Sequence, residues 1–284
     1  MLKRLIYIVL LLTLSGCGLI SLGYNYVPAY LRYSINSYMS YNDLQKEIIR
    51  KEVDDYMAWH RKSMLPEYAD YLQGIHNAVQ AETSLTVEDV RRFRTEGRAL
   101  YVATMLPAVS PVGLLLASLN AEQVDALSLS FAEEIKKVRN KELAGNLEQQ
   151  LRARAERSID FIENLTGGLT DKQLQQLREL NNKLPFATPV YLAQRENNQN
   201  KLIELLKLKP KELSTAIATA LSSWIVTPEL NRSAEDQSVI QVFESGSDDM
   251  IVSIYQTLDE RQKKKLLNSI TKYINTFQDL ASAS

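Results

Sequence analysis

Cysteine and histidine, the side chains that most often act as nucleophile or acid–base group, are scarce in this sequence. The chain has a single cysteine, Cys17, and two histidines, His60 and His76. Zinc and iron sites need several His, Cys or carboxylate ligands at close spacing, and neither histidine stands in such a set. The sequence also lacks a glycine-rich phosphate loop and a nucleophile elbow. We therefore expect no metal, no cofactor and no catalytic residues, and a protein that is not an enzyme.

The cysteine follows a segment that is typical of a secretory signal. Two basic residues precede an apolar run over residues 5–14, and small residues occupy positions 15 and 16. The run is too short to span a bilayer, which takes about 20 apolar residues. Its end, Leu14-Ser15-Gly16-Cys17, resembles the bacterial lipobox. The resemblance implies cleavage between Gly16 and Cys17 and acylation of Cys17 by three chains such as palmitate.

The lipobox resemblance also implies a cellular address. In such lipoproteins an Asp after the cysteine marks retention in the inner membrane, so Gly18 indicates the outer membrane, with the protein facing the periplasm. Two acyl chains already anchor a protein stably, so the first expected partner is the membrane, through Cys17. The alternative is an ordinary secretory signal followed by a free cysteine.

Composition and charge point to an ordinary folded body behind this anchor. Hydrophobic residues make up 45% of the chain, and the formal net charge is −1, so a nucleic acid is not an expected partner. We expect a signal peptide at 1–16, a lipidated N-terminus and short tether at 17–26, and a helical body at 27–284. A subdivision near 107–119 is left open. The expected partner of the body is a protein or another envelope component.

One helix-start signal recurs along the body. It consists of a leucine, a capping residue, two further residues and then Gln or an acid, which predicts a capping box. It occurs at Leu85–Asp89, Leu119–Gln123, Leu169–Gln173, Leu258–Gln262 and, more weakly, Tyr41–Gln45. Apolar residues recur between these starts at helical spacing. We predict an all-α, multi-helix bundle with kinked long helices and no sheet.

Several breaks between these helices are also predicted. Gly145 and Gly167-Gly168 should end helices, and Ser110-Pro111 should open a short apolar one. Ser245-Gly246-Ser247 is predicted to be a loop whose last serine caps the next helix. No segment after the signal is expected to be long enough to span a membrane.

Tyrosines crowd the stretch after the signal. Tyrosine has an apolar ring and a polar hydroxyl, which suits a membrane interface. The favoured alternative is a helix packed on the body, with Tyr30, Tyr33 and Tyr41 on a core stripe.

The most distinctive internal stretch is a candidate structural or binding cluster. It runs from Trp59-His60-Arg61 through Pro66 to Tyr68. Pro66 should end or kink a helix there, and Arg61 or Asp70 could pair across the bend. A structural role is the favoured interpretation. One alternative for function is an enzyme that uses His60 and a carboxylate such as Asp70 as an acid–base pair.

Two family resemblances complete the sequence evidence. Leu22–Asn25, Trp59–Arg61 and Leu65–Ala69 resemble an uncharacterised family of gammaproteobacterial lipoproteins, a domain of unknown function that would cover nearly the whole chain. Separately, Leu169–Gln173 is similar to the L-T-x-x-Q motif of Spy-like and CpxP-like periplasmic chaperones. That similarity and the apolar stretch Leu114–Leu116 suggest another alternative for function, a membrane-tethered holdase for unfolded clients. Such a holdase would present an exposed apolar groove.

Overall fold

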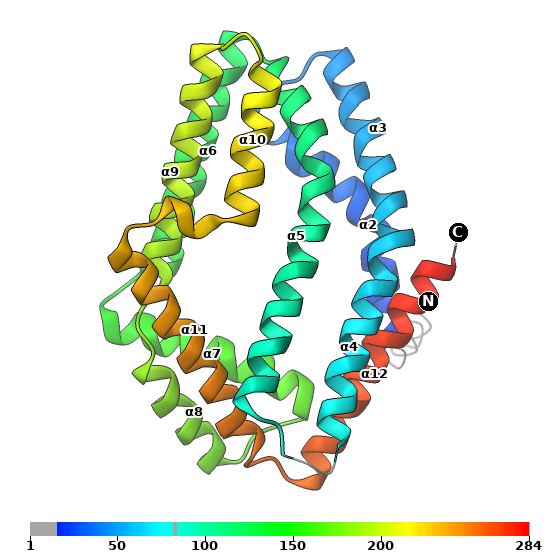
Figure 1. Ribbon diagram of the computed structural model, residues 1–284, viewed down its shortest axis with the longest axis vertical. Helices are drawn as coiled ribbons and strands as arrows, with labels where there is room; N and C mark the ends of the chain where they lie inside the picture. Colours follow the sequence, from blue (N-terminus) through cyan, green and yellow to red (C-terminus); the bar gives the residue numbers. More distant parts are fainter. Residues whose placement is uncertain (1–15, 82–83, 284) are drawn as a thin grey trace, which may run out of the picture.

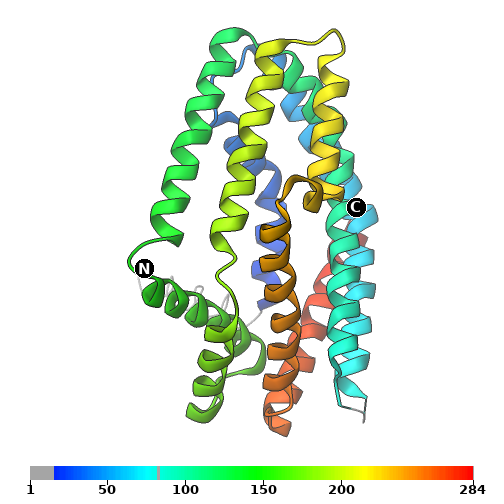
Figure 2. The same ribbon diagram turned by 60° about the vertical axis from the view of Figure 1, so that its left-hand side comes forward.

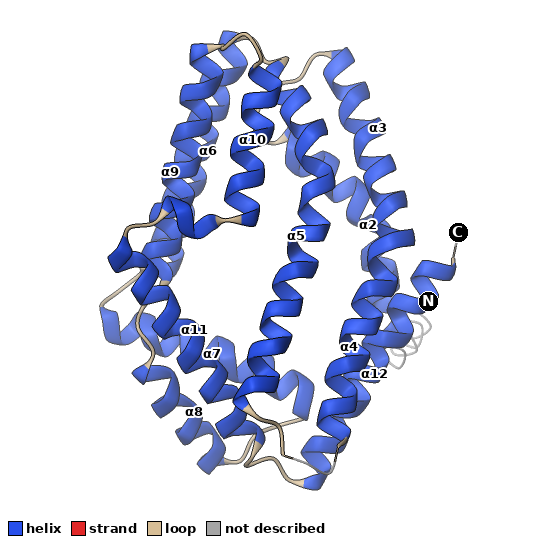
Figure 3. Cartoon of the chain, in the orientation of Figure 1, coloured by secondary structure: helices blue, strands red, loops and turns tan. Residues whose placement is uncertain are grey.

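The computed structural model describes residues 16–81 and 84–283, with side chains from residue 21 onward. Within these ranges the chain consists of helices joined by short turns, and no strand occurs (Figure 3). The predicted all-α class is therefore confirmed. The predicted signal peptide and the Cys17 side chain lie outside the described residues.

The first part of the body contains α2 (Gly16–Asn36), α3 (Asp43–Trp59), the π-helical turn η1 (His60–Met64), α4 (Leu65–Gln80) and α5 (Val87–Ala117). The middle contains α6 (Ala121–Glu142), α7 (Leu147–Thr166), α8 (Asp171–Lys183) and α9 (Thr188–Leu208). The last part contains α10 (Leu213–Val226), the 3-10 turn η2 (Pro228–Asn231), α11 (Ala234–Tyr255) and α12 (Glu260–Ser282).

Two long helical segments set the shape of the body. α3, η1 and α4 follow one another without a break along the long axis, and α5 runs back beside them (Figures 1 and 2). In one half α10 packs on α5, with α6 and α9 beyond it; in the other half α11 packs on α5 and α12 on α4, with α7 and α8 beyond them. The largest buried apolar cluster lies in the first half and includes Ile49, Leu127, Leu206 and Ile217.

α5 is longer than the sequence predicts. Ser110-Pro111 does not open a new helix, because α5 continues through Pro107 and Pro111 to Ala117. A proline inside a helix removes one N–H and crowds the carbonyl four residues back, which loosens the turn before it. The Tyr56 hydroxyl donates to the Thr104 carbonyl (3.0 Å), so a carbonyl of the turn before Pro107 has a partner from another helix.

The expectation that no later segment could span a membrane is wrong for the same reason. The uninterrupted α5 contains an 18-residue window of mean hydropathy 1.8 and is long and apolar enough to cross a bilayer. In the structure it packs against α10, α11, α4 and α3. Its contact with α10 is close at Gly113, where an added Cβ would lie 3.0 Å from the Ser214 carbonyl oxygen.

α11 also continues through a predicted break. The predicted loop at Ser245–Ser247 is helical, and Asp248 is buried in the middle of α11 rather than at a helix start. The guanidinium of Arg94 on α5 donates to both oxygens of Asp248 (3.0 Å each). An added Cβ at Gly246 would lie 2.5 Å from a Leu184 methyl group, so the glycine makes room for packing.

α2 packs on the body with a different face from the predicted one. Tyr41 is buried as predicted, but Tyr30 and Tyr33 are 66% and 72% exposed, so the predicted core stripe is wrong at both. The helix extends through the segment predicted as a tether. Its inward side chains, together with Tyr38 just after the helix, pack on the largest core cluster: Tyr24, Val27, Leu31 and Ile35.

The predicted capping boxes are all present. In each, the capping side chain accepts from the N3 backbone N–H, and the N3 side chain accepts from the capping residue's N–H. Asn146 and Gln149 form a further box that the sequence analysis missed. The predicted stops at Gly145 and Gly167 are confirmed, and both residues have positive φ.

Four of the capping glutamines form two buried pairs. Gln45 and Gln123 donate to each other's side-chain oxygens (3.2 and 2.7 Å), as do Gln173 and Gln262 (3.0 and 2.9 Å). Each Nε2 also donates to a loop carbonyl next to the partner helix. The first pair joins α3 to α6 and the second joins α8 to α12, at opposite ends of the body (Figure 1).

We expect Gln262→Ala to lower the free energy of unfolding by about 1–3 kcal/mol, because the buried amide of Gln173 loses its partner. Gln149→Ala is the matched control, since Gln149 closes an identical capping box but is exposed and unpaired with another glutamine. That change should stay within about 0.5 kcal/mol. Urea denaturation of both variants measures the difference, and equal losses would show that the buried pair adds nothing to the cap.

Candidate functional site

The candidate cluster lies at η1, midway along the segment formed by α3 and α4. Pro66 has no N–H, and its ring would crowd the Lys62 carbonyl in a regular helix. The chain accommodates it with a wider turn, in which the Leu65 N–H donates to the carbonyl of His60, five residues back. The predicted bend at Pro66 thus takes the form of a π-helical turn, a feature often found at functional sites.

His60 is held by a tyrosine hydroxyl on each ring nitrogen. The Thr104 hydroxyl donates to the Leu100 carbonyl (2.8 Å), so the Tyr68 hydroxyl donates to Thr104 and its oxygen is left to accept. His60 Nε2 lies 3.4 Å from that oxygen, and Nδ1 lies 2.9 Å from the Tyr24 hydroxyl. This chain of donors places a proton on Nε2, and in the neutral imidazole Nδ1 accepts from Tyr24.

Arg61 ties this turn to both ends of the described chain. Its guanidinium donates to Asn25 Oδ1 on α2 (2.7 Å) and to the carbonyls of Leu280 (3.2 Å) and Ala283 (3.4 Å) at the end of α12. The guanidinium carbon also lies 5.0 Å from the centre of the Tyr24 ring. Residues from the separate motifs Leu22–Asn25 and Trp59–Arg61 thus meet in space.

Asp70 forms neither the acid–base pair with His60 nor a pairing across the Pro66 bend. Asp70 is exposed, and it makes no ion pair within the described part of the chain. The hydrogen bonds of the His60 ring go to Tyr24 and Tyr68, and Arg61 reaches α2 and α12 instead of crossing the bend. Because a general base must reach the proton that it removes, the arrangement gives no support to an acid–base pair of His60 and Asp70.

The cluster is half-buried among aromatic rings, and this burial shifts its titrations. Burial lowers the pKa of His60 and raises the pKa of Tyr24, because both charged forms lose hydration. Burial also raises the pKa of Tyr56 to about 12. The ring of Trp59 packs beside Tyr56, with 5.5 Å between ring centres. The polar groups described here bind one another, so these contacts fix the positions of α2, α4, α5 and α12.

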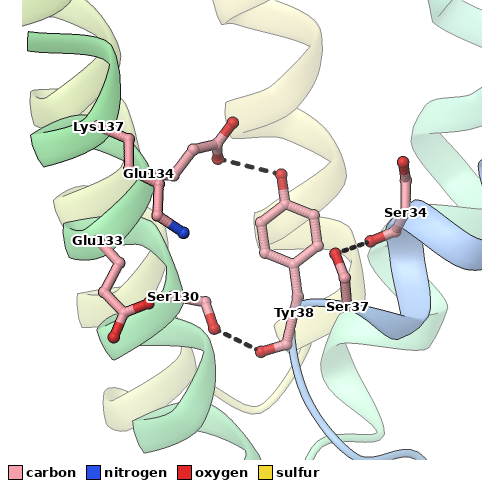
Figure 4. A pocket seen from close by; sticks show the side chains of 7 residues that line it. All are labelled: Ser34, Ser37, Tyr38, Ser130, Glu133, Glu134 and Lys137. Atoms are coloured by element: carbon pink, nitrogen blue, oxygen red, sulfur yellow. Dashed lines mark hydrogen bonds between the residues drawn. The ribbon is translucent and has the colours of Figure 1, made fainter. Parts of the chain in front are cut away.

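A first cavity, of ≈ 280 Å³, lies where the end of α2 meets α6 (Figure 4). The Tyr38 hydroxyl donates to Glu134 (3.1 Å), and the Ser130 hydroxyl donates to the Tyr38 carbonyl (2.6 Å). Burial, followed by the Glu134 charge, raises the pKa of Tyr38. Since its central side chains already bind each other, this cavity is a junction between α2 and α6 rather than a good ligand site.

A second cavity, of ≈ 410 Å³, resembles a small-molecule binding site more closely than the first cavity does. It is lined by α5, α6, α9 and α10, and each contributes one aromatic ring: Tyr101, Phe131, Tyr191 and Trp224. Its volume falls within the range of about 300–1,000 Å³ that is usual for small-molecule sites. Such sites combine apolar and aromatic walls with a few polar groups that fix orientation.

The polar groups of this cavity differ in what they already bind. Gln194 donates to the Pro228 carbonyl (2.6 Å) and accepts from Arg232 (2.9 Å). Arg195 pairs with Glu134 (2.7 Å). Asn198 Oδ1, in contrast, is buried and has no hydrogen-bond partner in the described part of the chain. A buried carbonyl oxygen without a donor costs about 1–3 kcal/mol, which an N–H or O–H of a ligand would recover.

No local pattern in the sequence points to the residues that line this cavity. Its aromatic rings come from four helices at long separations, so no local spacing joins them. The one available signal is the amide-rich run over residues 194–200, which places Gln and Asn in the middle of α9. Within the described residues, no group of three His, Cys, Asp or Glu side chains could hold a metal ion.

Residues 37–225 match a protein family whose description is "Family of unknown function (DUF6279)". The matched range contains the Trp59–Arg61 and Leu65–Ala69 motifs and all four aromatic rings of the second cavity. It does not reach Leu22–Asn25 or the lipobox, and so is shorter than the resemblance implies. No curated protein and no solved structure matches the chain.

We expect the stability that His60 contributes to depend on pH. Burial lowers the pKa of His60 below the ordinary 6.5. As the pH falls toward 6.5 and below, the histidine is therefore protonated more readily in the unfolded chain than in the native chain, which destabilises the native state. His60→Asn should cost about 1–3 kcal/mol near neutral pH, through lost hydrogen bonds. The difference in unfolding free energy between wild type and variant should then shrink as the pH falls from about 7.5 to about 5.5.

Urea denaturation at several pH values measures this difference directly. A difference that stays constant or grows on acidification would contradict a buried, neutral His60. Titration of the His60 ring protons by NMR, with His60→Asn used for assignment, provides an independent reading of the same pKa.

Proposed function

Since the chain belongs to DUF6279, a family of unknown function, we propose a role drawn from its own residues: a lipid-anchored, non-enzymatic binding protein of the bacterial envelope. Its ligand would sit in the second cavity. The observation that carries this proposal is a cavity lined by four aromatic rings and by Asn198, whose buried side-chain oxygen has no partner among the described residues.

The anchor is the part of the proposal that comes from the sequence. Leu14-Ser15-Gly16-Cys17 supports acylation of Cys17, and Gly18 supports an outer-membrane address facing the periplasm. With no other cysteine in the chain, acylation would leave no free thiol. The helical body would then be tied to the membrane from the first turn of α2.

The cavity chemistry favours a peptide segment of a protein as the ligand. A peptide N–H can donate to Asn198 Oδ1, and its apolar side chains can pack on the rings of Tyr101, Tyr191 and Trp224. The basic side chain in the lining, Arg195, already pairs with Glu134, so the cavity offers little free charge to an ionic ligand.

A holdase for unfolded clients is the second candidate, and the exposed surface of α5 favours it. Only 17% of the apolar 18-residue window of α5 is buried. Its exposed apolar side chains include Tyr101, Leu106, Val112 and Leu114. Unfolded proteins bind such surfaces through their own apolar segments. A holdase would therefore bind many clients, whereas a specific cavity would bind few.

We expect Cys17→Ser to release the protein from membranes and to abolish its labelling by radioactive palmitate, because no thiol remains to carry the acyl chains. Gly18→Asp is the matched control for address: the protein should keep its label but move to the inner-membrane fraction. Fractionation of cell envelopes on a density gradient reads both results. A wild-type protein without label, recovered with an intact Met1, would contradict the anchor.

We expect a photo-crosslinking amino acid at Tyr191 to form a discrete protein adduct in the native envelope, and the same group at Phe161 to form none. Phe161 is a matched control because it is an exposed aromatic residue outside the cavity. Adding Asn198→Leu should lower the Tyr191 adduct by about tenfold, since the buried acceptor is gone. A smear of many clients would favour the holdase, and a glycan adduct or equal labelling at Phe161 would refute peptide binding in the cavity.

A further inference from the structure

We propose that the outward face of α2 lies on the membrane surface, so that the protein rests on the bilayer along this helix as well as being tethered to it. This inference depends on the proposed anchor at Cys17. It concerns an interaction surface that the anchor alone does not require, because a tethered body could equally well stand clear of the lipid.

The surface is an exposed apolar and aromatic stripe. It consists of Leu22, Tyr26, Tyr30 and Tyr33, which are 50%, 70%, 66% and 72% exposed. Steps of four, four and three residues, at about 100° per residue, keep these side chains within about 80° of one face. We call this set the tyrosine stripe.

The stripe is rigidly presented, because the opposite face of α2 is fixed to the body. The Tyr24 hydroxyl forms a hydrogen bond with His60 Nδ1, and Asn25 Oδ1 accepts one from Arg61. Just after the helix, the Tyr38 hydroxyl donates to Glu134. Apolar side chains between them, Val27 and Leu31 among others, pack into the largest core cluster. The stripe therefore cannot turn inward without breaking contacts along the whole helix.

The chemistry of the stripe suits a lipid headgroup region. Tyrosines are enriched at membrane–water interfaces, where the ring contacts lipid and the hydroxyl stays hydrated. The only charged residue of α2 is Arg32, and it pairs with Asp54 on α3 (2.5 Å). The stripe thus carries no charge that would have to be dehydrated on contact with a bilayer.

Position makes the membrane the natural occupant of this surface. α2 begins at Gly16, so its first turn contains the proposed acyl-bearing residue. At a rise of about 1.5 Å per residue, Leu22 lies only about 8 Å along the helix from Cys17, and the stripe extends for roughly another 17 Å. Acyl chains inserted at Cys17 would hold the stripe within reach of the headgroups.

The test uses the full-length acylated protein in vesicles of phosphatidylethanolamine and phosphatidylglycerol. With Cys17 acylated, a new cysteine is the only free thiol, so an environment-sensitive fluorophore can be attached at Tyr30→Cys. Leu230→Cys is the matched control, since Leu230 is 74% exposed and lies outside α2. Flotation of the vesicles reports the anchor, and the fluorophore reports contact with lipid.

We expect the fluorophore at position 30 to shift to the blue and to be quenched several-fold less by aqueous iodide than the one at position 230. A Leu22→Cys probe should show the same shift and should lose it when Tyr26, Tyr30 and Tyr33 are changed to Ser, while flotation is unchanged. Flotation without a shift at position 30, or equal shifts at 30 and 230, would overturn the stripe but leave the anchor standing. Failure of the wild-type protein to float would instead refute the anchor.

Discussion

The architecture depends on a property of the glutamine side chain: its amide can close a helix start and still bind another residue. In each buried pair the carbonyl oxygen accepts from the cap of its own helix, while the NH2 group donates to the partner glutamine and to a loop carbonyl. An acid at the same position has no proton to donate. Asp89 accordingly closes its own cap and joins no second helix, in contrast to Gln262. Two such pairs, one at each end, hold segments that are 78 and 89 residues apart in the sequence.

Between these two ends, the π-helical turn at His60 is the place where α2 and α12 are bound to the segment formed by α3 and α4. Tyr24 on α2 and Tyr68 on α4 bind the two ring nitrogens, and Arg61 binds α2 and the last turn of α12. The extra width of the turn is the local consequence of Pro66. His60, for which the sequence favours a structural role over acid–base catalysis, thus connects helices through both ring nitrogens, and these hydrogen bonds explain why burial can be tolerated without a counter-charge.

Features that depend only on neighbouring residues can be predicted from the sequence. Features that depend on contacts between distant residues cannot. Capping boxes need only residues three apart, so they are predictable, but which glutamines pair is not. Pro111 and Gly246 look like breaks, yet α5 and α11 continue through them, and α11 packs there against the distant residues Leu184 and Arg94. The position of the tyrosine stripe depends on which face of α2 packs on the core. That face is set by the contacts of Tyr24 and Tyr38, and sequence periodicity alone does not single out these two residues. The cavity was missed because its walls come from four helices.

The helix α2 and the second cavity are connected through one carboxylate. Glu134 accepts from the Tyr38 hydroxyl at the end of α2 through one oxygen and pairs with Arg195 of the cavity lining through the other. Phe131, one turn earlier on α6, stacks edge-on against Tyr38 and also lines the cavity. Because the same α6 side chains contact both sites, the seat of α2 on the body and the shape of the cavity cannot vary independently. The tyrosine stripe on α2 and the second cavity are therefore linked through the same side chains of α6.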